Sequence, residues 1–356
     1  STNNAHEVDY LGNEIMTYLD KLGQRKIDNA VTQFMSVANK TPYYFFKHMG
    51  RGGQELFSFL QNGWDKLADN VEVIKNFTRG TKKDGSDALY TSQEFEKWKN
   101  TVHEFDVLEA PTAEERAEGK EGRQRHITMT EAQIMALYCL SKREQAMGHI
   151  SRDGIVIDEI KTKKKYGKHE IKKQDAVTLA PTDLGKILSV VTNDARMKQV
   201  ADKIQEFMNT VCADWGNEVT MKLYGTEEFT EKNYFPIHVN QEILSTEAKD
   251  KSHSIYGMLN QSFTKPLTEG ARNEINIADI FDVFNAHASD MAKYNALALP
   301  IMDVIKVWNY KENLDRGDNG QREVKAVKKS ITKAIGKAGN SYISGLLRDL
   351  NGDAES

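Results

Sequence analysis

The sequence predicts a mainly α, multi-helical fold with one long central helix and one small lysine-rich β-hairpin. Apolar residues recur at helical spacing from Met197 to Leu223, an element about 42 Å long at a rise of 1.5 Å per residue. Capping residues and helix-starting prolines precede many of the other apolar stripes. Between Gly154 and Leu179 the pattern changes to two short β-branched runs around a lysine-rich turn, which favours a hairpin.

The first 80 residues are predicted to form helices. Two short helices broken near Gly23 are followed by an aromatic helix that begins at Thr41-Pro42. This helix is followed by Gly50, Arg51, Gly52 and Gly53. These four residues favour a tight turn between helices, and the alternative is an anion-binding nest. A longer helix then runs to Gly80, and its apolar stripe consists of Leu56, Leu60, Trp64, Leu67, Val71 and Ile74.

Capping boxes mark the next two helices. Thr91 and Glu94 open a helix that we expect to continue through Trp98 to Val102. The charged stretch 110–125 lacks periodicity and is interpreted as a mobile loop. A second box, either Thr128 with Glu131 or Thr130 with Gln133, opens a buried helix that should end near Gly148-His149.

The second half of the chain continues the helical pattern. Pro181 starts a helix before the long stripe, and Phe235, which precedes a proline, should be extended and pack against that stripe. The segment 252–268 is expected to be irregular. A stripe from Ile277 to Leu297 should be kinked or broken at Pro300, and two short helices, 321–335 and 340–350, should finish the chain.

These patterns suggest three parts. Residues 1–153 would form an N-terminal helical lobe, residues 154–180 the lysine-rich hairpin, and residues 181–356 a C-terminal helical lobe. Alternatively, the long helix could unite both lobes into one cooperative body. The lack of an initial Met and the polar end are expected of a piece of a longer polypeptide.

Composition argues against several classes of protein. Lys and Arg total 48 against 52 Asp and Glu, so the formal charge of −4 gives no overall attraction to nucleic acid or membrane. No apolar run reaches the roughly 18 residues that span a bilayer. Cys139 and Cys212 lie within apolar helical patterns and are expected in the core. Since the two cysteines do not resemble a disulfide framework, a reducing compartment is expected.

Local motifs for chemistry are not found. The nine histidines show no spacing that joins two imidazoles on adjacent helical turns, and the common hydrolase and phosphate-loop motifs are missing. The loop 315–320 resembles a calcium loop, but Gly317 and Ala326 occupy ligand positions, so it is interpreted as ending a helix. The sequence therefore predicts no metal, cofactor or catalytic residue, while an enzyme with a non-local active site stays an alternative.

Two basic features are candidate nucleic-acid contacts. The predicted hairpin carries Lys161, Lys163, Lys164, Lys165, Lys168, Lys172 and Lys173. One face of the helix predicted after residue 320 carries Arg322, Lys325, Lys329, Lys333 and Lys337. Both could contact phosphates, but solvated lysine faces are common, and neither patch has the interleaved aromatics of a single-strand binding platform.

Several motifs together resemble a known family. They are Ile127–Met135 with Leu137-Tyr138, Lys142–Ala146 with His149, Asn233–Ile237, and Asp279–Phe284 with Met291–Ala296. They resemble the large polyvalent-protein-associated regions of giant multidomain proteins of bacteriophages and conjugative elements, over about residues 90 to 350. The resemblance implies packing rather than chemistry, and it assigns no catalytic residue.

The leading functional hypothesis is a non-enzymatic structural and interaction module of a large mobile-element protein. It would bind a protein partner or neighbouring domains of a larger polypeptide, in the host cytoplasm or in association with the virion. The alternative is a nucleic-acid-binding module that uses the two basic features. Neither hypothesis involves a membrane.

Overall fold

The mainly α prediction is confirmed. The computed structural model describes residues 50–79, 92–157 except a few positions between 110 and 116, 176–239, 274–309, 311–315, 321–325, and scattered positions from 329 to 344. Of these residues, 68% are helical and 13% lie in strands. The expectations for residues 1–49 and 252–268 lie outside the described residues. No helix in the described part of the chain is long and apolar enough to cross a membrane.

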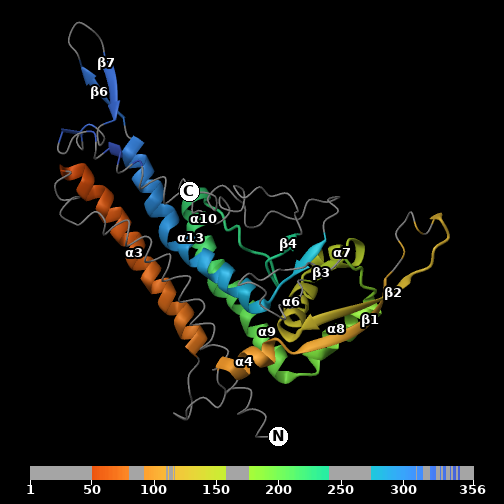
Figure 1. The fold of residues 1–356 in the computed structure, drawn as a ribbon. Coiled ribbons are helices and arrows are strands. Elements are labelled where there is room, and N and C mark those ends of the chain that lie inside the picture. Colours follow the sequence, from red (N-terminus) through yellow and green to blue (C-terminus); the bar gives the residue numbers. More distant parts are fainter. Residues whose placement is uncertain are drawn as a thin grey trace, which may run out of the picture.

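Three long helical elements form the frame (Figure 1). They are α3 (Gly50–Arg79), the continuous run of α9 (Ala195–Phe207), η1 (Met208–Cys212) and α10 (Ala213–Tyr224), and α13 (Ile280–Asn309). The sequence predicted one long central helix, a longer helix that ends at Gly80, and a helical stripe kinked or broken at Pro300. The run α9–η1–α10 confirms the predicted helix from Met197 to Leu223. It contains one π-turn, η1, which widens the helix by one residue.

Helix α13 does not break at Pro300. A proline removes one backbone hydrogen bond, but here tertiary packing outweighs that loss. A Cβ atom on Gly63 of α3 would lie only 3.1 Å from the Pro300 ring, so the two helices are in close contact at this point. At the start of α13, the Asp279 side chain accepts a hydrogen bond from the Phe281 backbone amide at 2.7 Å. Ile277, which was expected to belong to this helix, lies in a strand.

Residues Gly50 to Gly53 form the first part of α3, so the predicted tight turn is wrong. Glycine costs a helix roughly 1 kcal/mol relative to alanine, which lowers helix propensity without forbidding a helix. The apolar stripe that follows is buried at Leu67, Val71 and Ile74, and this burial stabilises the long helix. The anion-binding alternative stays a prediction, because the Arg51 side chain lies outside the described residues.

A β-hairpin follows α4 (Ser92–Lys99) and was not predicted. Strand β1 (Val102–Glu109) pairs antiparallel with β2 (Arg123–Thr130) in the register Val102↔Thr130 to Glu109↔Arg123. The helix expected to reach Val102 therefore ends at Lys99, and the loop expected to reach residue 125 ends where β2 begins. Pairing between segments distant in sequence decides this structure, and local propensity does not reveal it.

The capping box of Thr130 and Gln133 is confirmed, but its helix is shorter than predicted. Helix α6 (Glu131–Ser141) is buried along almost its whole length, and α7 (Glu144–Arg152) follows as a separate helix. The break falls at Arg143, whose backbone is extended at φ −93° and ψ 113°. Its guanidinium donates to the Phe235 carbonyl at 3.1 Å, so a tertiary contact accompanies the break.

A small mixed sheet joins distant parts of the chain. Strand β3 (Ile155–Ile157) pairs in parallel with β5 (Ile275–Ile277), which pairs antiparallel with β4 (His238–Val239). An antiparallel bridge between Ile155 and Val177 agrees with the predicted hairpin only in part, because the main partner of β3 is β5. The lysines between these two positions lie outside the described residues. Helix α8 (Pro181–Thr192) begins at Pro181, as predicted.

The predicted helix 321–335 is wrong over its first five residues. Strands β6 (Lys311–Asp315) and β7 (Gln321–Lys325) form an antiparallel hairpin, so Arg322 and Lys325 do not share a helix face with the later lysines. The cross-strand pairing offsets the helical preference of this stretch. The loop interpreted as ending a helix instead lies between two strands. Lys329, Lys333 and Lys337 are helical and exposed.

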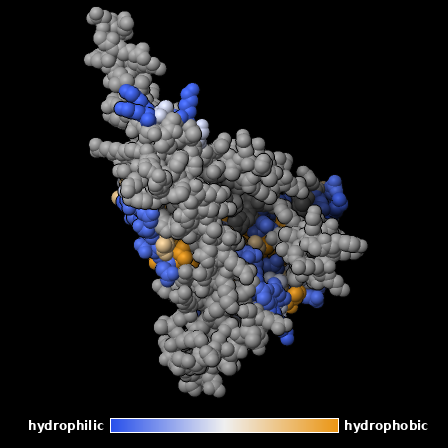
Figure 2. All heavy atoms as spheres, turned by 60° about the vertical axis from the view of Figure 1, so that its left-hand side comes forward, coloured by the Kyte–Doolittle hydropathy of each residue, from blue (hydrophilic) through white to orange (hydrophobic). Residues whose placement is uncertain are grey.

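One hydrophobic core joins the described helices. Its members run from Leu67 in α3 to Trp308 in α13 and include residues on both sides of the predicted boundaries at 153 and 181. Phe77, Phe207 and Phe284 bring α3, α9 and α13 together, with ring centroids 4.3 to 5.6 Å apart. On the face shown in Figure 2, the described residues are mostly hydrophilic.

Candidate functional site: a polar cleft on helix α9

A polar cleft opens beside α9. Its walls are the carboxyl end of α6, one face of α9 and η1, and the segment Phe229–Tyr234, here called the strap. The cleft has a volume of about 740 Å³. Its lining consists of Tyr138, Lys142, Lys198, Asp202, Gln205, Glu206, Asn209, Phe229, Thr230, Glu231, Lys232 and Asn233.

Two asparagines fix the ends of the strap. The Asn217 side chain in α10 accepts from the Phe229 amide at 2.8 Å and donates to the Phe229 carbonyl at 3.0 Å. The Asn209 side chain in η1 does the same for Tyr234, at 2.7 and 2.9 Å. Because each amide group satisfies both backbone groups of one residue, the strap is held without being part of a sheet.

Two further contacts hold the middle of the strap. Gln205 donates to the Asn233 carbonyl at 2.9 Å and to the Cys139 carbonyl at 3.1 Å, which links the strap to α6. Arg143 forms a two-point ion pair with Glu231, in which one nitrogen–oxygen distance is 2.6 Å. Two parallel hydrogen bonds of this kind fix geometry as well as charge. The cleft therefore has a preformed wall.

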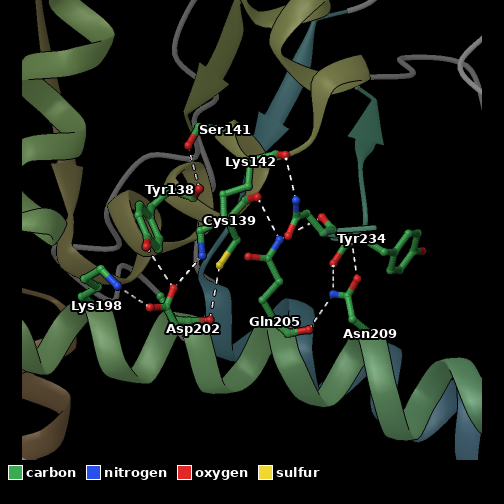
Figure 3. A network of polar contacts seen from close by, with 11 residues as sticks. Tyr138, Cys139, Ser141, Lys142, Lys198, Asp202, Gln205, Asn209 and Tyr234 are labelled. Carbon is green, nitrogen blue, oxygen red and sulfur yellow. Dashed lines mark hydrogen bonds and ion pairs between the residues drawn. The ribbon is translucent and has the colours of Figure 1, made fainter. Parts of the chain in front are cut away.

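At one end of the cleft, three donors converge on Asp202. Its carboxylate accepts from the Tyr138 hydroxyl at 2.9 Å, from the Lys142 ammonium at 2.6 Å and from the Lys198 ammonium at 2.7 Å. We call these four residues the Asp202 cluster (Figure 3). The Lys142 ammonium also lies 4.2 Å from the centroid of the Tyr138 ring, a cation–π contact.

The cluster keeps its charges at neutral pH. Burial alone would raise the pKa of Asp202, but hydrogen bonds from Lys142, Lys198 and Tyr138 lower it below its ordinary value. Burial alone would lower the pKa of Lys142, but its hydrogen bond to Asp202 raises it. The hydrogen bond to Asp202 also raises the pKa of Lys198. The cluster therefore holds two ammonium groups and one carboxylate.

The cleft as a whole has no net charge. Three lysines (Lys142, Lys198 and Lys232) face three carboxylates (Asp202, Glu206 and Glu231), so their formal charges cancel. A polyanion would meet as much repulsion as attraction here. Charges of both signs at fixed positions instead suit a protein segment that also carries both signs.

The two thiols near the cleft are not suited to nucleophilic chemistry. Cys139 is fully buried, its thiol lies 3.5 Å from the Ala201 carbonyl, and burial raises its pKa to about 12. Burial also raises the pKa of Cys212 in η1. A thiol with a raised pKa holds little of the reactive thiolate at neutral pH. Within the described residues, no group of three or more His, Cys, Asp or Glu side chains could hold a metal ion.

A second cluster, centred on a carboxylate of the same long helical run, also joins one carboxylate with two lysines and one neutral donor. The Glu218 carboxylate in α10 pairs with Lys66 at 2.5 Å and Lys222 at 3.3 Å, and it accepts from Asn295 at 2.9 Å. We call these four residues the Glu218 cluster. Asn295, 1% exposed, also accepts from Asn70 at 2.9 Å, so the cluster ties α3, α10 and α13 together. None of its members lines the cleft.

Of the candidate contacts that fall within the described residues, none lines the cleft. Gly50 to Gly53 lie in α3, and Arg322 and Lys325 lie in β7. The sequence did contain a signal for the cleft, because Tyr138 with Lys142 and Lys198 with Asp202 are pairs spaced by four residues on helices. Such pairs are frequent, and the convergence of two pairs from different helices cannot be read from spacing.

Comparisons with known proteins do not place this chain in a family. No family model matches the sequence. No curated protein and no solved structure matches it either.

Proposed function

We propose that the chain is a non-enzymatic structural and interaction module of a large mobile-element protein, and that it binds a segment of a protein partner or of a neighbouring domain in the polar cleft. The observation that carries this proposal is the balanced set of charges on a preformed wall. Preformed sites lose little conformational entropy on binding, so they favour recognition of a partner segment.

The motifs behind the family resemblance support the proposal by their position. Tyr138 and Lys142 lie at one wall of the cleft, Asn233 lies in the strap, and Arg143 links to Glu231 in the strap. These motifs lie about 90 residues apart in the sequence and meet at one site. Membership of that family stays part of the proposal.

Site-specific photo-cross-linking tests this function. p-Benzoylphenylalanine at Thr230, an exposed cleft residue, should give discrete protein adducts in host cells that produce the chain. The matched control is the same amino acid at Tyr224, which is 56% exposed on α10 and does not line the cleft. Equal adducts from both positions, or none from either, would contradict the proposal. A substrate turned over by the purified chain would contradict its non-enzymatic part.

Nucleic-acid binding is a second candidate, favoured by one observation. Lys329, Lys333 and Lys337 are exposed, lie at intervals of four residues on helical backbone, and do not line the cleft. If four lysines contact duplex phosphates, affinity should fall about a hundredfold between about 50 and 200 mM salt. Gel-shift assays should compare the wild type with alanine replacements of these three lysines and, separately, of Lys163, Lys164, Lys165 and Lys168. Equal binding by all three proteins would reject this candidate.

A further inference from the structure

We infer that the cleft recognises a short extended peptide segment that carries an acidic residue and, three or four positions away, a basic residue. This inference rests on the proposed function and adds the chemistry of the bound segment. It follows from how charge is distributed along the face of α9 that lines the cleft.

The acid-binding end is the Asp202 cluster. Two ammonium groups share one carboxylate there, so the cluster carries one uncompensated positive charge. Each lysine ammonium has three N–H donors, and the contact with Asp202 occupies one on each. The side chains of Lys142 and Lys198 are 29% and 49% exposed and both line the cleft. A carboxylate of the bound segment can therefore accept from both lysines.

The base-binding end is Glu206. It lies one helical turn beyond Asp202 on the same face of α9 and also lines the cleft. Among the described residues, Glu206 forms no ion pair, whereas Glu231 is paired with Arg143. A lysine or arginine of the bound segment would give Glu206 a partner.

The spacing of the two ends sets the spacing within the segment. Lys198 and Glu206 are eight positions apart on one helix, so their backbones are separated by about 12 Å along the helix axis at 1.5 Å per residue. An extended peptide advances about 3.3 Å per residue, so the same distance spans three to four residues. An acidic and a basic residue at that separation can reach both ends together.

The test is selection from a displayed library of random linear peptides on the immobilised full chain. Four proteins are compared: the wild type, Lys198→Gln, Glu206→Gln and the matched control Lys222→Gln. Lys222 also pairs with a carboxylate four residues away on a helix, but outside the cleft. The side chains of Lys198, Glu206 and Lys222 are all exposed to solvent. Thermal unfolding should verify that each variant is folded.

The wild type and Lys222→Gln should enrich peptides with Asp or Glu three or four positions from Lys or Arg. Lys198→Gln should lose the acidic preference and Glu206→Gln the basic preference. A synthetic peptide from the wild-type selection should bind each of these two variants about tenfold more weakly. Enrichment without the paired charges, or an unchanged pattern in both variants, would overturn this inference and leave the proposed function standing. No enrichment by any of the four proteins would contradict both.

Discussion

The carboxylates of the Asp202 and Glu218 clusters lie on one continuous helical run, α9–η1–α10, and the two clusters are built alike. Each has a carboxylate that binds two lysines and one neutral donor, and the two carboxylates are 36% and 41% exposed. One cluster forms the end of a cleft, and the other ties α10 to α3 and α13. The comparison shows that chemistry alone does not make a site. The concave wall built by α6 and the strap distinguishes the two clusters.

The largest effect is expected in the buried part of the Glu218 cluster. Asn295→Leu removes the hydrogen bonds of Asn295 with the Asn70 side chain, the Trp215 carbonyl and the Glu218 carboxylate, and leaves Asn70 with the Ala292 carbonyl. A lost hydrogen bond costs about 0.5 to 1.5 kcal/mol between neutral groups and about 1.5 to 3 kcal/mol to a charged group, so the free energy of unfolding should fall by about 3 kcal/mol. Urea denaturation followed by circular dichroism measures this change. Asn62→Ala on the exposed face of α3 is the control, with an expected change below about 0.5 kcal/mol.

A loss below about 1 kcal/mol for Asn295→Leu would show that the interior network does not hold the three long helices together.

A smaller effect is expected where the strap packs on α10. A Cβ atom on Gly216 would lie 2.4 Å from the Phe229 ring, so Gly216→Ala must displace that ring. Overpacking of this kind costs about 1 to 3 kcal/mol. Hydrogen exchange of the strap amides should accelerate, because Phe229 anchors one end of the strap. The yield of photo-cross-linked adducts from position 230 should decrease in the same variant.

The control for this substitution is Gly148→Ala in α7, where an added Cβ meets no atom within 4 Å. Helix propensity alone should make that variant more stable by up to about 1 kcal/mol. If both alanine variants leave strap exchange unchanged, Phe229 is not the anchor that the geometry indicates.

A still smaller effect concerns pH. Hydrogen bonds from Lys66 and Asn295 overcome the burial of Glu218 and lower its pKa from 4.5 to about 2. A lowered pKa means that the stabilisation is fully present above about pH 4.5 and is lost as the pH falls towards 2. The carboxylate is 41% exposed, so solvent screening reduces the contribution to about 1 kcal/mol.

Glu218→Gln should therefore be less stable than the wild type by about 1 kcal/mol near pH 7, and the difference should vanish near pH 2. Urea midpoints at several pH values measure it. Asp202→Asn should show the same sign, because the pKa of Asp202 is also lowered. A difference that grows on acidification would mean that the ion pairs at Glu218 do not stabilise the fold.

Local signals in the sequence were enough to predict several helices correctly. The box at Thr130 and Gln133, the proline at position 181 and the stripe from Met197 each act within one helical turn or one helix face, and each prediction is confirmed. The hairpin β1–β2 and the break at Arg143 depend on contacts between distant residues. Local propensity does not contain that information.

The candidate site was beyond prediction for the same reason. Its wall depends on Asn209 and Asn217, whose side chains bind the backbone of residues 25 and 12 positions away. Such amides look like ordinary surface residues in a helical pattern. The π-turn η1, which carries Asn209, leaves no mark in the spacing of the apolar residues that flank it.

The most direct test of the account compares the same charge reversal in the two clusters. Lys198→Glu and Lys222→Glu each reverse a half-exposed lysine that pairs with a carboxylate four residues away on a helix. The yield of partner adducts at Thr230 should fall about tenfold in Lys198→Glu and stay within about twofold of the wild type in Lys222→Glu. Equal yields from both variants, whether reduced or unchanged, would contradict the claim that the cleft makes the Asp202 cluster a binding site.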